Sequence, residues 1–481
     1  MSDTQVGTRS LRALLGDWRD SAAGPSYLAL FDRIRLLILD GRIPADARLP
    51  AERDLAQALE VSRTMVTAAY RELREAGYTS VRRGSGSVTR LPGRGTGSAP
   101  EPAGTGLIDF TRATLPASPG IIAATEAALA GYRRYLGGTG LHFAGIPELR
   151  DAVAARFTAR GLPTTREEIL ITNGAQHAIF LVSRVLLARG DRALVEQPSY
   201  PHASDALLLA GARLVPVSVT VGAGWDSAAL ETAIRRTSPT LGYLMPDFHN
   251  PTGESMSAEL RERVIGLAHG QGAVLVVDET AGELNIDRAG SLLPFAAYAD
   301  AAQRSSVITI GSVGKSVWDG LRVGWVRADA GIIQKLTAAR PAGDFGTPVL
   351  EQLVVAELLG DMHGILAARR IQLRAGRDHV LGVLADRFPE WTPGRPAGGI
   401  ATWVNLGSAV SSQLTLAARG QGLLITAGPR FGQGGTLERF LRIPISFPVP
   451  ELDRGLAALA LAWRSLPRTP LTESQVFADM V

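Results

Sequence analysis

The sequence predicts an α/β protein in two parts, a small helical head and a large domain with a mostly parallel sheet covered by helices. Residues 1–90 hold amphipathic helical segments followed by an alternating, hairpin-like stretch. From residue 108 to 481, apolar strand-like runs such as "AVLVVDE" and "SSVITIGS" alternate with helical segments, a pattern typical of parallel sheets. Residues 91–107, rich in Gly, Pro and small residues, cannot bury a core and are expected to form a flexible linker.

The overall composition narrows the classes of protein that need to be considered. Hydrophobic residues make up 46% and charged residues 20% of the chain, and no apolar run of about 18 residues predicts a membrane span. The start, "MSDTQVGTRSLRALLGDWRD", has no apolar signal core, so we expect a cytoplasmic protein. The chain has no cysteine, and its seven histidines show no HExxH spacing, so no metal site is expected.

Three helices and a hairpin are expected in the head. The stretch "YLALFDRIRLLILDGRI" predicts a helix that ends near Gly41. "LPAERDLAQALEV" predicts a second helix, and "SRTMVTAAYRELREAGY" a third, with Ser62 as N-cap and Gly77 at its end. "TSVRRGSGSVTRL" predicts the hairpin. The buried face of the first helix is expected to consist of Leu28, Phe31, Ile34, Ile38 and Leu39.

The positive charge of the head is concentrated in one short segment. Residues 61–90 carry six arginines against Glu72 and Glu75, a net charge of +4, which favours an anionic partner. A helix, a short turn and a second helix form a helix-turn-helix, in which the first residues of the second helix contact DNA bases. Ser62, Arg63 and Thr64 occupy that place. The alternative is a helical dimerisation module with solvated charges.

The motifs "LPAERDLA" and "RRGSGS" resemble those of the GntR-type winged helix-turn-helix, and the resemblance covers about residues 26–90. It implies that the hairpin is a DNA-contacting wing and that the partner is operator DNA. By this resemblance, Arg53, Arg63, Thr64 and Gly86 contact DNA, and Ser62, Arg82 and Arg83, at the start of the second helix and in the hairpin, complete the residues expected there.

In the large domain, polar residues follow three of the strand-like runs. "EILITNGAQHAIFLV" has Gly174, Ala175 and Gln176 between a strand and a helix, where backbone amides can hold a phosphate. Asp278 and Glu279 end the run "AVLVVDE", and Asn250 precedes a Pro-Thr-Gly turn. Taken singly, each has an ordinary alternative, namely helix capping for the first two and a plain turn for Asn250.

Lysine is nearly absent from the chain, which has two lysines and 48 arginines. Lys315 stands among small residues in "SVGKSVWDGLRVGW", whereas Lys335 has the surroundings of a helix surface. A lysine with a lowered pKa forms an imine with an aldehyde, and an arginine does not. Pyridoxal 5'-phosphate needs such a lysine, a carboxylate at its pyridine nitrogen, phosphate ligands and a donor to its ring oxygen. The candidates are, in turn, Lys315; Asp278; Gly174, Ala175, Gln176, Ser312 and Arg322; and Asn250.

The order of these motifs resembles the fold type I, class I/II aminotransferases over about residues 108–465. The resemblance implies the roles just given, with Lys315 as the catalytic lysine, and it adds Tyr200 of "EQPSYP" as the residue stacked on the cofactor ring. It also implies that Arg442 of "RFLRIPISF" binds a substrate carboxylate, with Arg439 close by and a surface ion pair as the alternative. Thr280 and Ala281 depart from the family, which usually has a tyrosine here. The departure predicts altered cofactor electronics and weak or partial transamination.

A GntR-type head joined to an aminotransferase-like domain resembles the MocR/GabR group of transcription regulators. That resemblance implies a DNA-binding regulator that senses pyridoxal phosphate, with or without an amine or amino acid effector, and that forms a head-to-tail homodimer. The alternative is an active aminotransferase that carries a DNA-binding head. A regulator that does not use the cofactor is a third, less favoured hypothesis.

Overall fold

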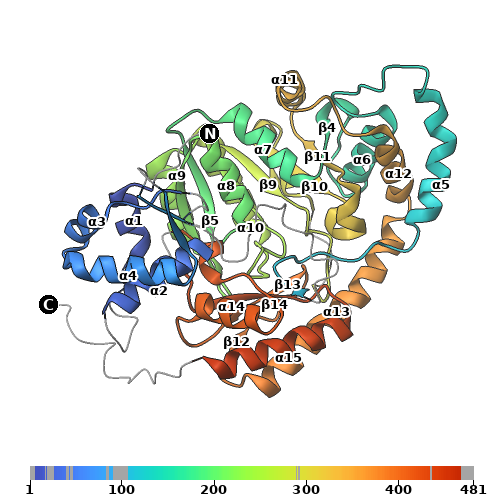
Figure 1. Cartoon of the computed structure of the whole chain (residues 1–481). Coiled ribbons are helices and arrows are strands. Elements are labelled where there is room, and N and C mark those ends of the chain that lie inside the picture. The colour runs from blue at the N-terminus through green and yellow to red at the C-terminus, as the bar shows by residue number, and fades with distance from the viewer. Residues whose placement is uncertain are drawn as a thin grey trace. The chain divides into compact units, whose positions relative to one another are not determined.

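The computed structural model describes residues 6–16, 18, 26–39, 43, 47–82, 86–89, 107–288, 290, 293–433 and 436–466. They form two compact units (Figure 1). The first unit comprises Met1–Thr111, Val410–Ala427 and Asp453–Val481, and the second comprises Arg112–Ala409 and Gly428–Leu452. Arg83, Gly41 and residues 91–106 of the expected linker lie outside the described residues. The domain boundaries given above therefore stay a prediction.

The first unit begins with a helical core built on apolar residues at helical spacing. Its central pair is the helix-turn-helix of α3 and α4, and Ser62 Oγ caps α4 by accepting from Met65 N at 3.3 Å, as expected. The hairpin pairs Thr79 with Thr89 and Arg82 with Gly86. The elements are α1 (Thr8–Leu15), α2 (Ser26–Leu39), α3 (Glu52–Leu59), α4 (Arg63–Glu75), β1 (Thr79–Arg82) and β2 (Gly86–Thr89).

The expected buried face of α2 is wrong in part. Besides Ala29, the buried positions among the described side chains of α2 are Leu30, Ile34, Leu37 and Ile38, whereas Leu28 and Phe31 are only partly covered. These four residues follow the spacing i, i+4, i+7 and i+8 of an α-helix, so the apolar stripe is turned relative to the predicted one. The side chain of Leu39 is outside the described part.

Helix α1 was not expected from the sequence. Its Leu11 and Leu15 are fully buried in the core of the head. Arg33 of α2 donates to Leu15 O at 3.1 Å, which satisfies a carbonyl at the end of α1. Val6 N donates to Arg48 O at 3.0 Å, so the segment before α1 is attached beside the strand pair. The helical core therefore begins about 20 residues ahead of the predicted first helix.

The first unit also contains segments that come later in the sequence, Val410–Ala427 and Asp453–Val481. Strand β3 (Ile108–Asp109) pairs in parallel with β14 (Leu423–Leu424). Helix α14 (Ser411–Gly420) precedes β14, and most of α15 (Val449–Ser465) lies in this unit. Within it, Phe110 packs so closely on Gly455 that a side-chain carbon at 455 would lie 2.2 Å from the ring, so α15 needs glycine there.

The second unit is built on a sheet of order β4-β11-β10-β9-β8-β5-β6-β7. Strands β10, β9, β8, β5 and β6 pair in parallel, whereas β11 runs antiparallel to β10 and β4, and β7 is antiparallel to β6. The mostly parallel α/β fold is thus confirmed. The strands are β4 (Ile169–Thr172), β5 (Arg192–Gln197), β6 (Arg213–Thr220), β7 (Gly224–Trp225), β8 (Leu241–Leu244), β9 (Val274–Asp278), β10 (Val307–Ser312) and β11 (Gly324–Arg327).

Helices cover both faces of this sheet, and side chains alternate between two cores. Ile169 and Ile171 face one core, and Leu170, between them, faces the other. The first core is covered by α5 (Ile121–Tyr132), α6 (Pro147–Ala159), α9 (Ser227–Thr237), α10 (Ala258–Gly270) and α12 (Val349–Leu359). The second is covered by α7 (Ala175–Leu186), α8 (Pro201–Leu209) and α11 (Ala330–Ala339).

A smaller antiparallel sheet, β12-β13-β15, completes the second unit. Its strands are β12 (Thr392–Pro393), β13 (Ala401–Asn405) and β15 (Phe440–Pro444), and the long helix α13 (Met362–Arg387) precedes them. Trp403 on β13 lies opposite Arg442 on β15. Of the helices in the described part of the chain, none has the length and apolar character needed to cross a membrane. No group of His, Asp and Glu in that part could hold a metal ion.

Candidate functional site

Lys315 follows the end of β10 in a π-helical turn, η6 (Gly314–Trp318). Its Nζ donates to Ala113 O at 3.2 Å. Burial lowers the pKa of Lys315, and the positive charges of Arg442 and Arg322 lower it further, while Asp319 and Asp278 oppose them. A lowered pKa favours the neutral amine, which is the nucleophilic form. Lys335 is exposed on α11, as the sequence suggests.

Tyr200, at the start of α8, experiences the same set of charges. Burial raises the pKa of Tyr200 to about 12, the carboxylates of Asp278 and Asp319 also raise it, and Arg442 and Arg322 oppose them. Residues from separate elements, distant in the sequence, therefore act on both Lys315 and Tyr200. The structure brings these candidates together at one place in the second unit.

Three strands align the segments that are expected to hold a phosphate. Ser312 on β10 lies opposite Gly324 on β11, which in turn lies opposite Thr172 at the end of β4. A side-chain carbon on Gly324 would lie 2.7 Å from the carbonyl carbon of Gly174, so only glycine fits at 324. Gly174 has a φ of +80° and starts α7. Ala175 and Gln176 are the first residues of that helix, whose amides form an anion-binding end.

Arg322 lies against this turn. Its Nη2 donates to Asn173 O at 3.3 Å, and its Nη1 meets Asp319 Oδ1 at 2.8 Å. A side-chain carbon at Gly174 would come within 2.7 Å of Arg322 Nη2. The guanidinium thus lies directly beside a turn that must be glycine. Ser312 Oγ donates to Val323 O at 2.9 Å and accepts from Gly314 N at 3.0 Å, so a phosphate contact would require it to exchange a partner.

Asp278 ends β9 with 7% of its surface exposed. Its Oδ1 accepts from Thr280 N at 2.9 Å, and its Oδ2 accepts from the hydroxyl of Tyr243 on β8 at 2.7 Å. Tyr243 was missed from the sequence. Its only signal there is a polar hydroxyl in the otherwise apolar run "TLGYLMP", which does not name a partner.

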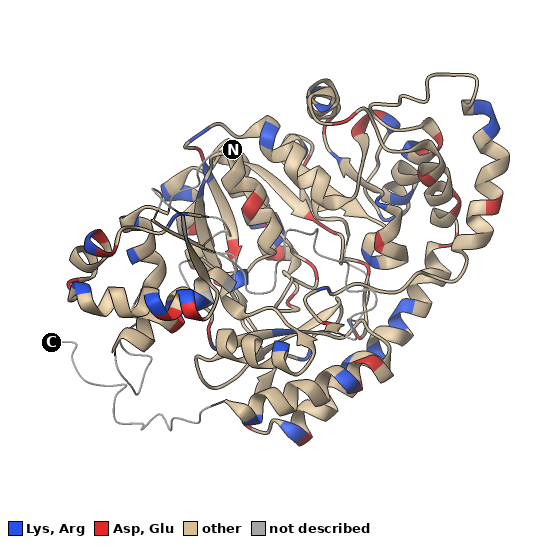
Figure 2. Cartoon of the chain, in the orientation of Figure 1, with Lys and Arg blue, Asp and Glu red and all other residues tan. Residues whose placement is uncertain are grey.

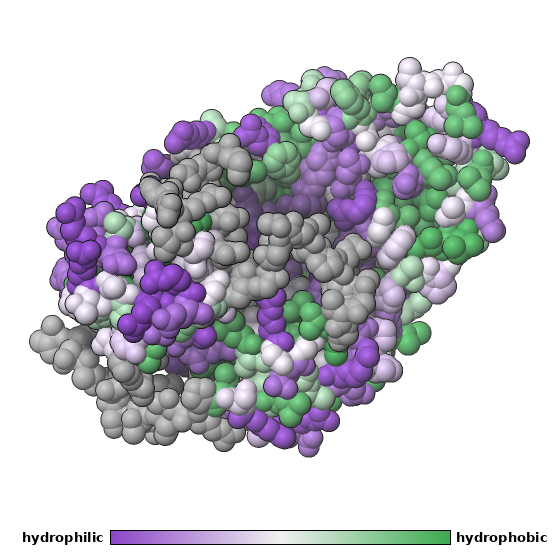
Figure 3. All heavy atoms as spheres, in the orientation of Figure 1, coloured by the Kyte–Doolittle hydropathy of each residue, from purple (hydrophilic) through white to green (hydrophobic). Residues whose placement is uncertain are grey.

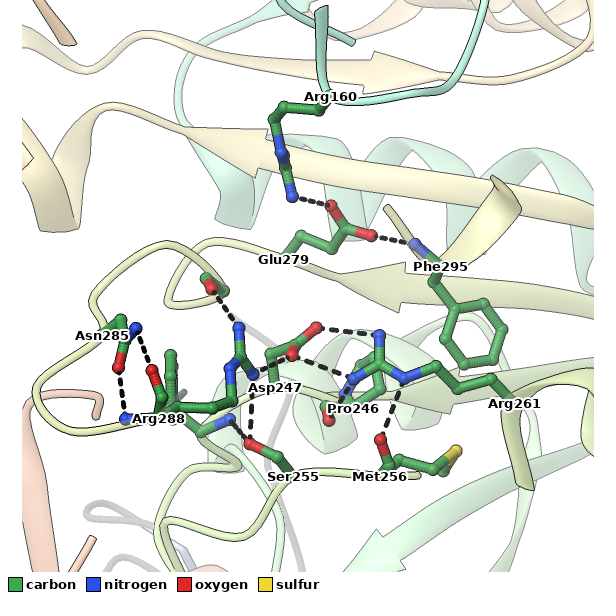
Figure 4. Close-up of polar contacts among 12 residues, drawn as sticks. Arg160, Pro246, Asp247, Ser255, Met256, Arg261, Glu279, Asn285, Arg288 and Phe295 are labelled. Carbon is green, nitrogen blue, oxygen red and sulfur yellow. Dashed lines mark hydrogen bonds and ion pairs between the residues drawn. The ribbon is translucent and has the colours of Figure 1, made fainter. Parts of the chain in front are cut away.

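The adjacent carboxylate, Glu279, belongs to a different set of contacts (Figure 4). Its Oε1 accepts from Phe295 N at 2.6 Å, and Arg160 Nη2 lies 3.5 Å from its Oε2. Nearby, Arg261 binds Asp247 through two nitrogens at 2.9 and 3.1 Å, and Arg288 also meets Asp247. These are buried structural ion pairs of the kind that lose stability when one partner is removed.

Asn250 lies in the turn after β8, and its Oδ1 is buried without a hydrogen-bond partner among the described residues. A buried amide with unused hydrogen-bonding capacity is costly, unless a ligand completes it. The neighbouring His249 is held between Thr252 Oγ1 at 2.9 Å and Glu196 Oε2 at 3.3 Å. The contacts of His249 therefore fix the turn that carries Asn250.

Arg442 and Arg439 differ in exposure. Arg442 is 7% exposed on β15, with its guanidinium 5.1 Å from the ring centre of Phe431, whereas Arg439 is exposed. Arg442 also acts on Lys315 and Tyr200, as described above. The geometry thus favours Arg442 as the group that faces the site.

These residues fit the cofactor that the sequence predicts. The site has a lysine whose pKa is lowered, a buried carboxylate, a glycine-lined turn beside a guanidinium, and a buried amide with unused capacity. The lysine would meet the aldehyde of pyridoxal phosphate, the carboxylate its ring nitrogen, and the glycine-lined turn with the guanidinium its phosphate. The amide of Asn250 would donate to the ring oxygen through Nδ2, since its unpaired Oδ1 is an acceptor. Thr280 and Ala281 stand where a tyrosine is usual, and a different tyrosine, Tyr243 on β8, hydrogen-bonds Asp278.

In the first unit, those of the residues expected at DNA whose side chains or glycine backbone the structure describes are exposed. Arg53 is 83% exposed at the start of α3, and Arg63 and Thr64 are exposed at the start of α4. Figure 2 shows basic residues at both ends of α4, with acidic residues among those at its carboxyl end. Gly86 has a φ of +78° and starts β2. The side chain of Arg82, like all of Arg83, is outside the described part.

Two family models match the chain. The model described as aminotransferase class I and II matches residues 123–459, and that of the bacterial regulatory proteins of the gntR family matches residues 26–96.

The regulator relatives agree with both matches, and the solved structures agree with the aminotransferase match. The chain is 30% identical over 430 residues to the probable rhizopine catabolism regulatory protein MocR of Rhizobium meliloti, covering 83% of this chain and 85% of the relative. It is 25% identical to the uncharacterized HTH-type transcriptional regulator YdfD of Bacillus subtilis, covering 92% and 97%. The crystal structure of LysN, an alpha-aminoadipate aminotransferase from Thermus thermophilus complexed with N-(5'-phosphopyridoxyl)-L-leucine, has a TM-score of 0.68 and 30% identity. It covers 75% of this chain and 92% of that chain.

Proposed function

Because the chain belongs to the aminotransferase class I and II family and carries a gntR-family segment in the arrangement of MocR-type regulators, we propose that it is a ligand-responsive transcription regulator. Its α3–α4 pair binds operator DNA. Its aminotransferase-like part senses pyridoxal phosphate, alone or together with an amine or amino acid. A protein that acts on DNA in this way works in the cytoplasm.

The cofactor is pyridoxal phosphate. When bound, it supplies an aldehyde that takes up amines and a ring that withdraws electrons from them. Lys315 provides the amine that would react with the aldehyde, and its lowered pKa favours the neutral, nucleophilic form of that amine. Asp278 holds a proton at the ring nitrogen, Asn250 meets the ring oxygen, and Tyr200 covers the ring. The turn of Gly174 to Gln176, with Ser312 and Arg322, holds the phosphate.

Arg442 supports an effector that carries a carboxylate. It is a buried guanidinium whose charge acts on Lys315, so a carboxylate bound to Arg442 would lie close to the amine-binding position. An α-amino acid carries both an amine and a carboxylate. We therefore place an amino acid ahead of a simple amine as the sensed compound.

A homodimer accounts for the apolar surface at and beyond α5. Figure 3 shows apolar side chains gathered in this part of the second unit. Large exposed apolar patches mark interaction sites. The resemblance to the MocR/GabR group implies that the partner is a second copy of this chain, in a head-to-tail dimer. The exposed residues are Ile122, Leu129, Leu136, Leu141, Phe143 and Phe345, with Phe143 and Phe345 in edge-on contact.

The observation that carries the regulator hypothesis is the combination in one chain of two intact parts. The capped and exposed start of α4 keeps a DNA-contacting form, and the lysine site keeps its cofactor-binding groups. An active aminotransferase remains the second candidate, since the site contains every group named above except the usual tyrosine at 280 or 281.

The test is a paired measurement on the purified full-length chain. Duplexes selected from a random pool are titrated in mobility-shift assays, and multiple-turnover transamination is followed with common amino acids. The proposal expects nanomolar-range selection of one operator sequence, typical of specific DNA binding, and slow or absent turnover. Rapid turnover without sequence-specific DNA binding would favour the aminotransferase.

A further inference from the structure

Tyr243 and Asp278 form a buried pair between neighbouring strands. Tyr243 lies on β8, where the parallel register sets it opposite Val276 of β9, two residues before Asp278. Its side chain is 1% exposed, and its hydroxyl donates to Asp278 Oδ2 at 2.7 Å. The contact is set by the sheet and does not depend on a loop.

The hydroxyl of Tyr243 is a permanent donor. Burial raises the pKa of Tyr243 well above its ordinary value, and the negative charge of Asp278 raises it further. The hydroxyl therefore stays protonated at any physiological pH and always points its hydrogen at the carboxylate.

The second oxygen of the carboxylate is also held. Asp278 Oδ1 accepts from Thr280 N at 2.9 Å. A carboxylate oxygen can accept two hydrogen bonds, so, within the described part of the chain, each oxygen of Asp278 can accept one more. Donors fixed on both oxygens determine the plane of the carboxylate and the direction of the lone pairs that remain.

Neither of these donors carries a charge, and this separates Asp278 from its neighbour. Glu279 has Arg160 at 3.5 Å, whereas the two bonds to Asp278 come from a hydroxyl and an amide. A buried carboxylate held by neutral donors is suited to a cationic partner that comes from outside the chain. A protonated pyridine ring nitrogen is such a partner.

We propose that Tyr243 is a positioning residue for the cofactor, which orients the Asp278 carboxylate toward the ring nitrogen of pyridoxal phosphate. The inference rests on the proposed cofactor site. Tyr243 does not replace the tyrosine missing at 280 or 281, because its hydroxyl is engaged on the nitrogen side of the ring. This chain therefore carries a tyrosine hydroxyl behind Asp278, where it controls how firmly the ring nitrogen is held.

The test compares Tyr243→Phe with wild type and with Tyr298→Phe in the full-length protein. Tyr298 is a matched control because its ring contacts the Arg261 guanidinium, 5.5 Å from the ring centre, and that contact survives loss of the hydroxyl. The cofactor dissociation constant is measured by fluorescence titration with pyridoxal phosphate, and ring orientation by the visible circular dichroism of the bound cofactor. Melting of the cofactor-free proteins checks folding.

We expect Tyr243→Phe to raise the dissociation constant roughly tenfold to a hundredfold, as expected for a hydrogen bond to a charged group. At saturating cofactor it should also change the visible circular dichroism, and Tyr298→Phe should change neither. In an Asp278→Asn background, adding Tyr243→Phe should have little effect, because the group through which it acts has been altered.

Equal weakening in both backgrounds would reduce Tyr243 to a packing role and overturn the inference. Wild-type affinity and dichroism in Tyr243→Phe would overturn it as well, while leaving the cofactor site intact. A wild-type protein that does not bind pyridoxal phosphate would overturn the cofactor site and this inference together.

Discussion

The cofactor site and the surface of α3 and α4 that we propose to contact DNA are built in opposite ways. Lys315, Asp278 and Arg442 are buried or partly buried, and the charges of Asp278 and Arg442 act on the pKa values of both Lys315 and Tyr200. Arg53, Arg63 and Thr64 are exposed, and an ion pair of Arg53 with Asp54, at 3.6 Å, is also exposed. The residues of the first site are held by contacts within the protein, whereas those of the second are exposed side chains that are available to a partner.

This difference in burial determines how large the effect of a substitution should be and how many groups it should disturb. In the buried site one change disturbs several groups, because charges interact strongly when they are removed from water. At the exposed surface each arginine acts nearly independently of the others, and exposed ion pairs contribute little to the stability of the free protein. Effects of substitutions should therefore be large and coupled in the second unit, and smaller and additive in the first.

The largest effect is expected from Lys315→Ala. Loss of the only amine placed at the site should abolish the long-wavelength absorbance of the bound cofactor, so that the purified protein is no longer yellow. Lys335→Ala is the matched control, and it should keep the band because Lys335 is exposed on α11. Loss of the band in Lys335→Ala instead would show that the site assignment is wrong.

Asp278→Ala should have the next largest effect. It removes the partner of the ring nitrogen and leaves Tyr243 without its acceptor, so cofactor retention should fall roughly tenfold to a hundredfold. Glu279→Gln should lower the melting temperature through its contact with Arg160 but leave cofactor affinity unchanged. Equilibrium dialysis with pyridoxal phosphate measures the cofactor affinity of both variants, and thermal melting measures the stability of Glu279→Gln. Retention of the cofactor at wild-type affinity by Asp278→Ala would remove Asp278 from this role.

In the head, Arg63→Ala should cost about 1–3 kcal/mol of discrimination between operator and random DNA, the worth of a good base contact. Arg53→Ala should weaken both kinds of DNA alike and flatten the dependence of affinity on salt, as expected for a phosphate contact. Mobility shifts at several salt concentrations separate the two. Should both variants lose only sequence-independent affinity, the bases must be contacted elsewhere, with the hairpin as the first candidate.

The smallest effect is expected at the edge of the buried site, in the pair of Asp205 with Arg430. The Arg430 and His202 side chains outweigh partial burial and hold the pKa of Asp205 at about 2, below its ordinary value. A lowered pKa adds stability above about pH 4, which is lost as the pH falls toward 2. Asp205 is half exposed, so Asp205→Asn should cost less than about 1 kcal/mol at pH 7. Urea unfolding of both proteins at pH 7 and pH 3 should show this difference shrinking, and a constant difference would contradict it.

Sequence reasoning found the parts whose signal is local. The strands, the α4 cap at Ser62 and the polar residues after each strand could be predicted because turns, caps and alternation act over a few residues. Their functional roles came from the resemblance and remain predictions.

What the sequence did not reveal depends on packing between distant residues. Tyr243 meets Asp278 only through the register of β8 and β9, which the apolar run around Tyr243 does not encode. The buried face of α2 was misplaced, since its nearly continuous apolar residues do not single out one stripe before α4 packs on it. Helix α1 was missed because Leu11 and Leu15 provide only two buried positions in a short segment.

The central claim is that the state of the buried site changes how the exposed site binds DNA. Such coupling requires the ligand to bind two arrangements of the protein unequally. The most direct measurement is titration of operator DNA, with half-sites spaced to differ by half a helical turn, in the presence and absence of pyridoxal phosphate and an amino acid. The account predicts that the ligands change operator affinity or the preferred spacing in wild type, and that Lys315→Ala blunts the response with its head still folded. Identical curves for both proteins under every condition would contradict the claim and favour the aminotransferase.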